Sequence, residues 1–184
     1  MICGSAGSLD PLATIVQALP SPLDAAVVIL IHRPPDKPSR LSELVGLRTR
    51  LPVVIARHGA LIESGKIYIA PHGYQHLRVR PRTFELWTAP RIAFSRPAAD
   101  PLFESAAAAF GGDTVAVVLS GMGKNGTGGL PAVKNAGGLV FVQAPSEARC
   151  ASMPTHALGA VKADLCASAA EIGERVANLC RSLR

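Results

Sequence analysis

Three continuous apolar runs, at residues 25–31, 114–119 and 139–142, constrain the fold of this chain more than any other feature. A run without polar alternation is typical of a strand that is buried on both faces, as in a parallel sheet covered by helices. Segments with helical apolar spacing, such as residues 9–19 and 101–110, lie between these runs. The sequence therefore predicts an α/β fold with a doubly wound, mostly parallel sheet flanked by helices.

Further elements follow from local signals. Met1 to Gly4 reads as the end of a strand, and residues 53–56 read as another short strand. Three strands are expected to be antiparallel, so that a hairpin lies within this part of the chain: 66–70, 75–80 and 83–88. Three more helices are expected: one capped by Ser39 and ending near residue 50, and two at 154–158 and 168–183.

The length of 184 residues and the 48% of hydrophobic residues suit a single domain over residues 1–184, with no repeat and no linker. No apolar run reaches the ~18 residues of a membrane span, so direct membrane insertion is not expected. The four cysteines lack C-x-x-C spacing, which favours a reducing, cytoplasmic setting: Cys3, Cys150, Cys166 and Cys180.

The net charge of +6 reflects basic residues that are scattered along the chain rather than gathered in blocks. A surface that follows nucleic-acid phosphates needs a denser patch, so no nucleic-acid partner is expected. The scattered positive charge is better interpreted as a surface that attracts an acidic protein partner. His72 and His76 are four residues apart, but Gly73 places a turn between them, so no metal site and no cofactor are expected.

A glycine-rich segment, Ser120 to Gly126, follows the strand at residues 114–119. Glycine lets backbone amides converge on one point, and a helix is expected from near Gly126 to residue 135. An anion or a developing oxyanion suits such a place. A P-loop is excluded because Lys124 precedes Asn125 rather than Ser or Thr. A different phosphate-binding loop or a purely structural loop remains an alternative.

Ser5 and His32 each come directly after an expected strand. Carboxyl ends of parallel strands meet at one edge of a sheet, so both side chains and the glycine-rich segment are expected there. Ser5 has the alternative role of a helix cap, and His32 that of a partly buried polar residue. Taken together, a nucleophile, a base and convergent amides favour a serine hydrolase.

Six motifs, in this order, resemble those of one known family: ICGSAG at 2–7, LIHRPP at 30–35, GKIYIAP at 65–71, RPAADPLF at 96–103, LSGMGKNG at 119–126 and ASMP at 151–154. Over nearly its whole length the chain resembles the catalytic domain of the CheB-type chemotaxis receptor methylesterase, a protein-glutamate methylesterase. The resemblance implies hydrolysis of glutamate methyl esters, and deamidation of certain glutamines, on receptor signalling helices.

The resemblance also implies roles for individual residues. Ser5 corresponds to the nucleophile, His32 to the base, and the Met122 amide to an oxyanion donor. Ala6, Gly121 and Gly123 belong to the same oxyanion and substrate-binding region. The implied partners are methylated chemoreceptor helices or a similar protein substrate, and a receiver domain acting in trans. We expect no receiver domain within the chain itself.

Two positions depart from the family pattern. Asn125 stands where the family carries the triad aspartate, and Ala6 stands where a threonine commonly follows the nucleophile. An amide can orient the histidine but supplies no negative charge, so Asn125→Asp is expected to raise ester hydrolysis. Other candidate acids are Asp10, Asp36 and Asp100. The alternative is a catalytically weakened binding or regulatory module.

Overall fold

The computed structural model describes residues 1–33, 39–71, 73 and 75–181. Its main feature is a seven-stranded sheet in which every pairing is parallel. From edge to edge the strands are β3 (Val53–Ile55), β4 (Ile67–Ile69), β2 (Val27–Ile31), β1 (Ile2–Gly4), β7 (Val115–Val118), β8 (Leu139–Gln143) and β9 (Leu165–Ala167). The predicted fold class is confirmed.

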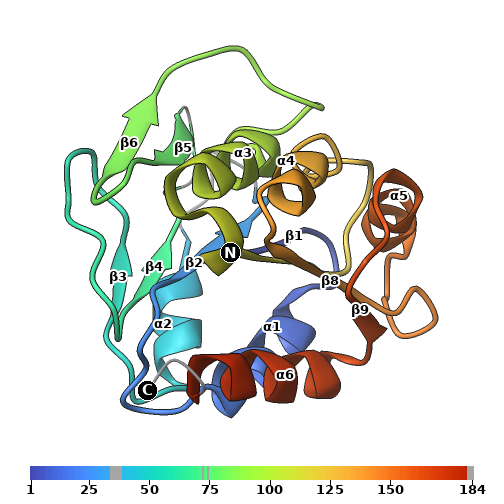
Figure 1. Cartoon of the computed structure of the whole chain (residues 1–184), viewed down its shortest axis with the longest axis horizontal. Helices are drawn as coiled ribbons and strands as arrows, with labels where there is room; N and C mark the ends of the chain where they lie inside the picture. The colour runs from blue at the N-terminus through green and yellow to red at the C-terminus, as the bar shows by residue number, and fades with distance from the viewer. Residues whose placement is uncertain (34–38, 72, 74, 182–184) are drawn as a thin grey trace.

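Helices cover both faces of this sheet (Figure 1). On one face lie α1 (Leu9–Ala18), α2 (Leu41–Gly46) and α6 (Ala169–Arg181). On the other lie α3 (Ala99–Phe110), α4 (Leu130–Asn135) and α5 (Ser152–Ala160), with a short 3₁₀ turn, η1 (Gly111–Asp113), after α3. In the described ranges no helix is both long and apolar enough to cross a bilayer.

The strand β2 shows why its sequence is apolar without alternation. Val28 and Leu30 belong to the core under α3, α4 and α5, whereas Val27, Ile29 and Ile31 belong to the core under α1, α2 and α6. Successive side chains of a strand point to opposite faces, so a strand between two helical layers needs apolar residues at every position. Each buried aliphatic side chain contributes roughly 1.5–3 kcal/mol.

Several local predictions are corrected. Residues 66–70 were expected to be antiparallel, but β4 is parallel to both β2 and β3, and all three of its residues are buried. The helix expected from Gly126 begins only at Leu130, because residues 126–129 form turns. The helix near Ser39 ends at Gly46, although the Ser39 hydroxyl does accept a bond from the Leu41 amide. The short edge strand β9 was not predicted.

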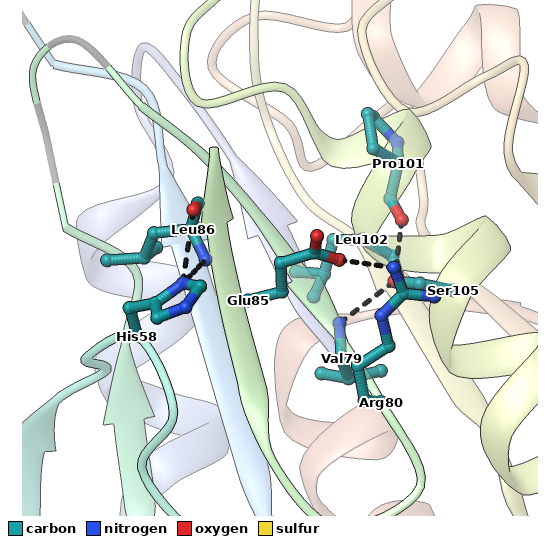
Figure 2. Close-up of polar contacts among 8 residues, drawn as sticks. All are labelled: His58, Val79, Arg80, Glu85, Leu86, Pro101, Leu102 and Ser105. Atoms are coloured by element: carbon teal, nitrogen blue, oxygen red, sulfur yellow. Dashed lines mark hydrogen bonds and ion pairs between the residues drawn. The ribbon is translucent and has the colours of Figure 1, made fainter. Parts of the chain in front are cut away.

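A second, antiparallel sheet confirms the expected hairpin: β5 (His76–Val79) pairs with β6 (Phe84–Trp87). Figure 2 shows how α3 holds it: the Val79 amide donates to Ser105 Oγ at 3.0 Å, and Ser105 Oγ donates to the Pro101 carbonyl at 2.7 Å. Arg80 and Glu85 pair across the hairpin at 2.8 Å, and the His58 ring bonds the Leu86 backbone. The middle of α3 therefore anchors the hairpin through Ser105.

Replacing Ser105 with alanine should weaken this attachment. The Val79 amide would lose its partner, and an unsatisfied buried donor costs about 1–3 kcal/mol. We expect Ser105→Ala to lower the free energy of unfolding by about that amount, measured by urea denaturation. The exposed Ser146 provides the matched control, and an equal loss in Ser146→Ala would contradict the assignment.

Candidate active site

The register of the sheet places Ser5 and His32 side by side. Gly4 at the end of β1 pairs with Ile31 at the end of β2, and the two residues of interest come next in the chain. The His32 amide donates to the Gly4 carbonyl at 3.0 Å, which continues the ladder by one step. On the other side of β1, the Ser5 amide donates to the Ser120 carbonyl at 2.9 Å. Backbone pairing alone thus gathers three segments at one sheet edge.

Ser5 and His32 line one cavity of about 310 Å³. The other lining residues are Arg33, Gly73, Arg91, Phe94, Ser95 and Arg96. A larger cavity of about 390 Å³ involves the opposite ends of β1 and β7, where Met1 and Val115 lie, and its lining contains no histidine. The smaller cavity is the candidate active site because it combines a hydroxyl and an imidazole.

Ser5 is not the cap of the following helix. The N-cap position of α1 is Ser8, and the Ser5 carbonyl accepts bonds from the Ser8 amide (3.1 Å) and the Ser8 hydroxyl (2.7 Å). The capping alternative for Ser5 is therefore wrong. Its side chain stays partly exposed on the cavity wall.

The His32 ring has the surroundings of a base. Its Nε2 is buried and has no hydrogen-bond partner within the described residues. Burial lowers the pKa of His32, while hydrogen bonding with the Asn125 side chain and the negative charge of Asp100 act in the raising direction. Because the burial effect is the largest, the ring stays neutral at pH 7, which is the protonation state that a general base requires.

The Asn125 side chain is buried and hydrogen-bonded to two backbone groups. Its Oδ1 accepts from the Ala99 amide at 2.7 Å, and its Nδ2 donates to the Ile92 carbonyl at 3.0 Å. Because an asparagine side chain can accept a hydrogen bond only through its oxygen, the Ala99 contact fixes which end of the side chain is Oδ1. Hydrogen bonding with His32 brings the Asn125 side chain beside the base, and its role as third member of the triad stays a prediction.

Of the other candidate acids that the structure describes, Asp100 is the one whose negative charge acts on His32. It is only 8% exposed, and its carboxylate accepts from the Gly126 and Gly129 amides, both at 3.0 Å. Asp10 lies exposed in the first turn of α1. Asp36 lies outside the described residues. The Asp100 carboxylate, whose charge acts on His32, is therefore hydrogen-bonded to the glycine-rich region. Its described hydrogen bonds do not include one to the imidazole ring.

The glycine-rich segment packs against Ser5. A Cβ added to Gly121 would lie 3.0 Å from Ser5 Cβ and would collide with the Met153 side chain, so a larger residue there would require Met153 to move. The Gly121 amide already donates to the Cys150 carbonyl at 2.9 Å, so Gly121 belongs to the predicted region through its packing against Ser5 and not through its amide. The amides of Ala6, Met122 and Gly123 have no such partner within the described residues and stay candidates.

One side of the cavity was missed by sequence reasoning. It is formed by the segment around the Ile92–Ser95 turn, which contributes Arg91, Phe94, Ser95 and Arg96. The turn contains no Gly, Asn or Asp, the residues that usually signal left-handed backbone, so the sequence carried no local sign of it. Within the described ranges no group of three His, Cys, Asp or Glu residues could hold a metal ion, and His72 lies outside them.

Removing the Asp100 carboxylate should destabilise this region. Asp100→Ala would leave the two buried glycine amides without acceptors, at about 1–3 kcal/mol each. We expect the free energy of unfolding to fall by about 2–6 kcal/mol in total, measured by chemical denaturation. The exposed Asp113 is the control, and Asp113→Ala should stay within about 0.5 kcal/mol of the parent. A comparable loss in both variants would contradict the structural role of Asp100.

Comparisons with known proteins point to one family. The family model for the CheB methylesterase matches residues 1–176. A protein of Leptospira interrogans is 32% identical over 170 residues, which cover 92% of this chain and 88% of that protein. The protein-glutamate methylesterase/protein-glutamine glutaminase of Pyrococcus horikoshii is 31% identical over 187 residues, which cover all of this chain and 50% of that protein.

A solved structure agrees with these relatives. The CheB methylesterase catalytic domain of Thermotoga maritima superimposes with a TM-score of 0.90 at 31% identity, covering 97% of this chain and 96% of that one. The likeness therefore extends over the sheet, both helical layers and the site edge. Because both the family model and the relatives span most of the chain, it belongs to the CheB methylesterase family of carboxylic ester hydrolases.

Proposed function

We propose that the cavity hydrolyses glutamate methyl esters of a protein substrate, with Ser5 as nucleophile and His32 as general base. The observation that carries the proposal is the parallel register of β1 and β2, which brings both residues to one cavity wall. By analogy with its relatives, whose names also include protein-glutamine glutaminase, the same site would deamidate glutamine side chains.

The reaction follows from the positions of these groups. Ser5 Oγ attacks the ester carbonyl carbon, and its proton passes to His32 Nε2, a buried nitrogen without a partner in the described residues. The imidazolium then protonates the departing methoxide, which leaves as methanol. Water attacks the resulting Ser5 acyl ester, returns its proton through His32, and releases glutamate.

The oxyanion formed in each step needs donors near Ser5. We assign this role to the backbone amides of Ala6 and Met122. Ala6 directly follows the nucleophile, and Met122 lies within the glycine-rich segment. A donor of this kind is worth about 10²–10³-fold in kcat. Gly123 shapes the same segment, and its carbonyl is held by the Ser152 hydroxyl at 3.1 Å.

Asn125 acts as the neutral third member of the triad. Its oxygen orients the ring, while the charge that favours the imidazolium comes from Asp100, which acts at a distance through its field. This arrangement stabilises the imidazolium less than a directly bonded carboxylate would, because Coulomb energy falls with distance. A slower but competent esterase is the expected result.

The substrate is, in this proposal, a methylated chemoreceptor helix or a similar protein, met in the cytoplasm. A receiver domain acting in trans would regulate access. The alternative of a binding module without activity is not favoured, because the relatives are named as enzymes and because the base keeps its neutral form.

The central test is labelling of Ser5. A fluorophosphonate probe should label the parent chain and leave Ser5→Ala unlabelled, and hydrolysis of an activated methyl ester should follow the same pattern. His32→Ala should reduce labelling by at least about 10³-fold, since the nucleophile loses its base. Peptide mass spectrometry locates the label, and labelling at another residue would refute the assignment.

The pH dependence tests the base and its partner together. Because burial lowers the pKa of His32, kcat/KM should decline only below about pH 6.5, the ordinary histidine value. In Asn125→Asp a carboxylate beside the ring raises the pKa, so the acid limb should move to higher pH, with a plateau increased by up to about 10²-fold. An unmoved limb would show that residue 125 does not act on the base.

A further inference from the structure

The Ile92–Ser95 turn has an unusual backbone. Ile92 and Ser95 exchange two backbone hydrogen bonds, of 3.1 and 2.9 Å. Between them stand Ala93 (φ 46°) and Phe94 (φ 65°), the only non-glycine residues of the described chain in the left-handed region. Such turns normally use Gly, Asn or Asp, so an alanine and a phenylalanine here carry a conformational cost.

Packing of the Phe94 side chain within the molecule does not offset the conformational cost of this turn. Its side chain is 92% exposed and belongs to neither hydrophobic core. A strained backbone persists where its surroundings determine it, and such strain gathers at functional sites. An aromatic ring held in water at the edge of a cavity is suited to bury its surface against another molecule.

The turn is tied to the catalytic segment. Asn125 donates from Nδ2 to the Ile92 carbonyl while its Oδ1 holds Ala99 at the start of α3. A carboxylate at position 125 has no hydrogen to donate and would place an oxygen against the Ile92 carbonyl. The asparagine therefore does something that an aspartate cannot: it holds the Phe94 turn in place.

His76 holds the two ends of the same loop. This histidine is fully buried, and its ring bonds both the Pro90 carbonyl (2.9 Å) and the Ala98 amide (3.2 Å). The Ala98 contact requires an acceptor nitrogen at Nδ1, so Nε2 carries the hydrogen that goes to Pro90. With both ends and the middle fixed, the loop presents Phe94 as a rigid feature and not as a free tip.

The charged side chains described at this cavity are positive. Of the eight described residues that line it, three are arginines, namely Arg33, Arg91 and Arg96, and none of the eight is acidic. Positive charge beside an exposed aromatic ring complements a segment that carries carboxylates and an apolar side chain. A basic or purely polar segment would gain nothing from this surface.

We propose that the Phe94 turn is a substrate-docking element: Phe94 packs on an apolar side chain of an acidic protein segment whose esterified glutamate enters the cavity. This inference rests on the proposed function and adds to it which substrates are selected. On a helical segment the apolar residue would stand three or four positions from the ester, where side chains share a face.

The test uses two acidic helical peptides that carry one glutamate methyl ester and either leucine or alanine four residues away. For the leucine peptide, Phe94→Ala should lower kcat/KM about tenfold, mostly through KM, and Phe94→Leu should restore most of it. For the alanine peptide, kcat/KM should differ less among the parent and these two variants. Replacing the flanking glutamates by glutamine should slow the parent enzyme several-fold, in a salt-dependent manner.

Leu47→Ala is the matched control, because Leu47 is 81% exposed and does not line the cavity. It should behave as the parent with both peptides. If Phe94→Ala hydrolyses the leucine peptide as fast as the parent while the fluorophosphonate still labels Ser5, the docking role is overturned and the esterase assignment stands. If Ser5 is not labelled and neither peptide is hydrolysed, the esterase assignment fails and the docking role fails with it.

Discussion

The parallel pairing of β1 with β2 and with β7 is the constraint on which the site depends. Gly4 lies opposite Ile31, and Cys3 lies opposite Val118, so three strands end at nearly the same height. The residues that come next are then held by backbone bonds, Ser5 to Ser120 and His32 to Gly4. A slip of one residue between β1 and β2 would separate nucleophile and base, and a slip in either pairing would move every apolar side chain of the slipped strand to the wrong layer.

A second consequence concerns the division of labour between Asn125 and Asp100. The buried amide bonds Ala99 and Ile92, while the buried carboxylate bonds the amides of Gly126 and Gly129. Asn125 thus holds the Ile92–Ser95 turn, and Asp100 holds the turn at residues 126–129. Negative charge remains close to the base, but it sits on a group whose oxygens are already occupied, so its influence on His32 is electrostatic.

Much of this fold could be predicted from local patterns, because burial on both faces leaves a direct trace in the sequence. The run ending at Ile31 predicted both a central strand and the place of His32. The β4 strand was given the wrong direction because a three-residue apolar stretch does not encode its partners: Ile69 pairs with Ile29 and Ile55, which are far away in sequence. The start of α4 was misplaced because glycines permit a turn as readily as a helix end.

The sequence by itself determined the buried strands, the residues at their carboxyl ends and the glycines that let the backbone approach Ser5. These are local properties, set by side-chain size, polarity and backbone freedom. Only the tertiary structure decided that the Gly121 amide is occupied by Cys150, that Asp100 faces the catalytic region, and that Phe94 stands exposed at the cavity edge. Those facts depend on contacts between residues that are distant in the chain, and such contacts form only when the sheet and its helices are assembled.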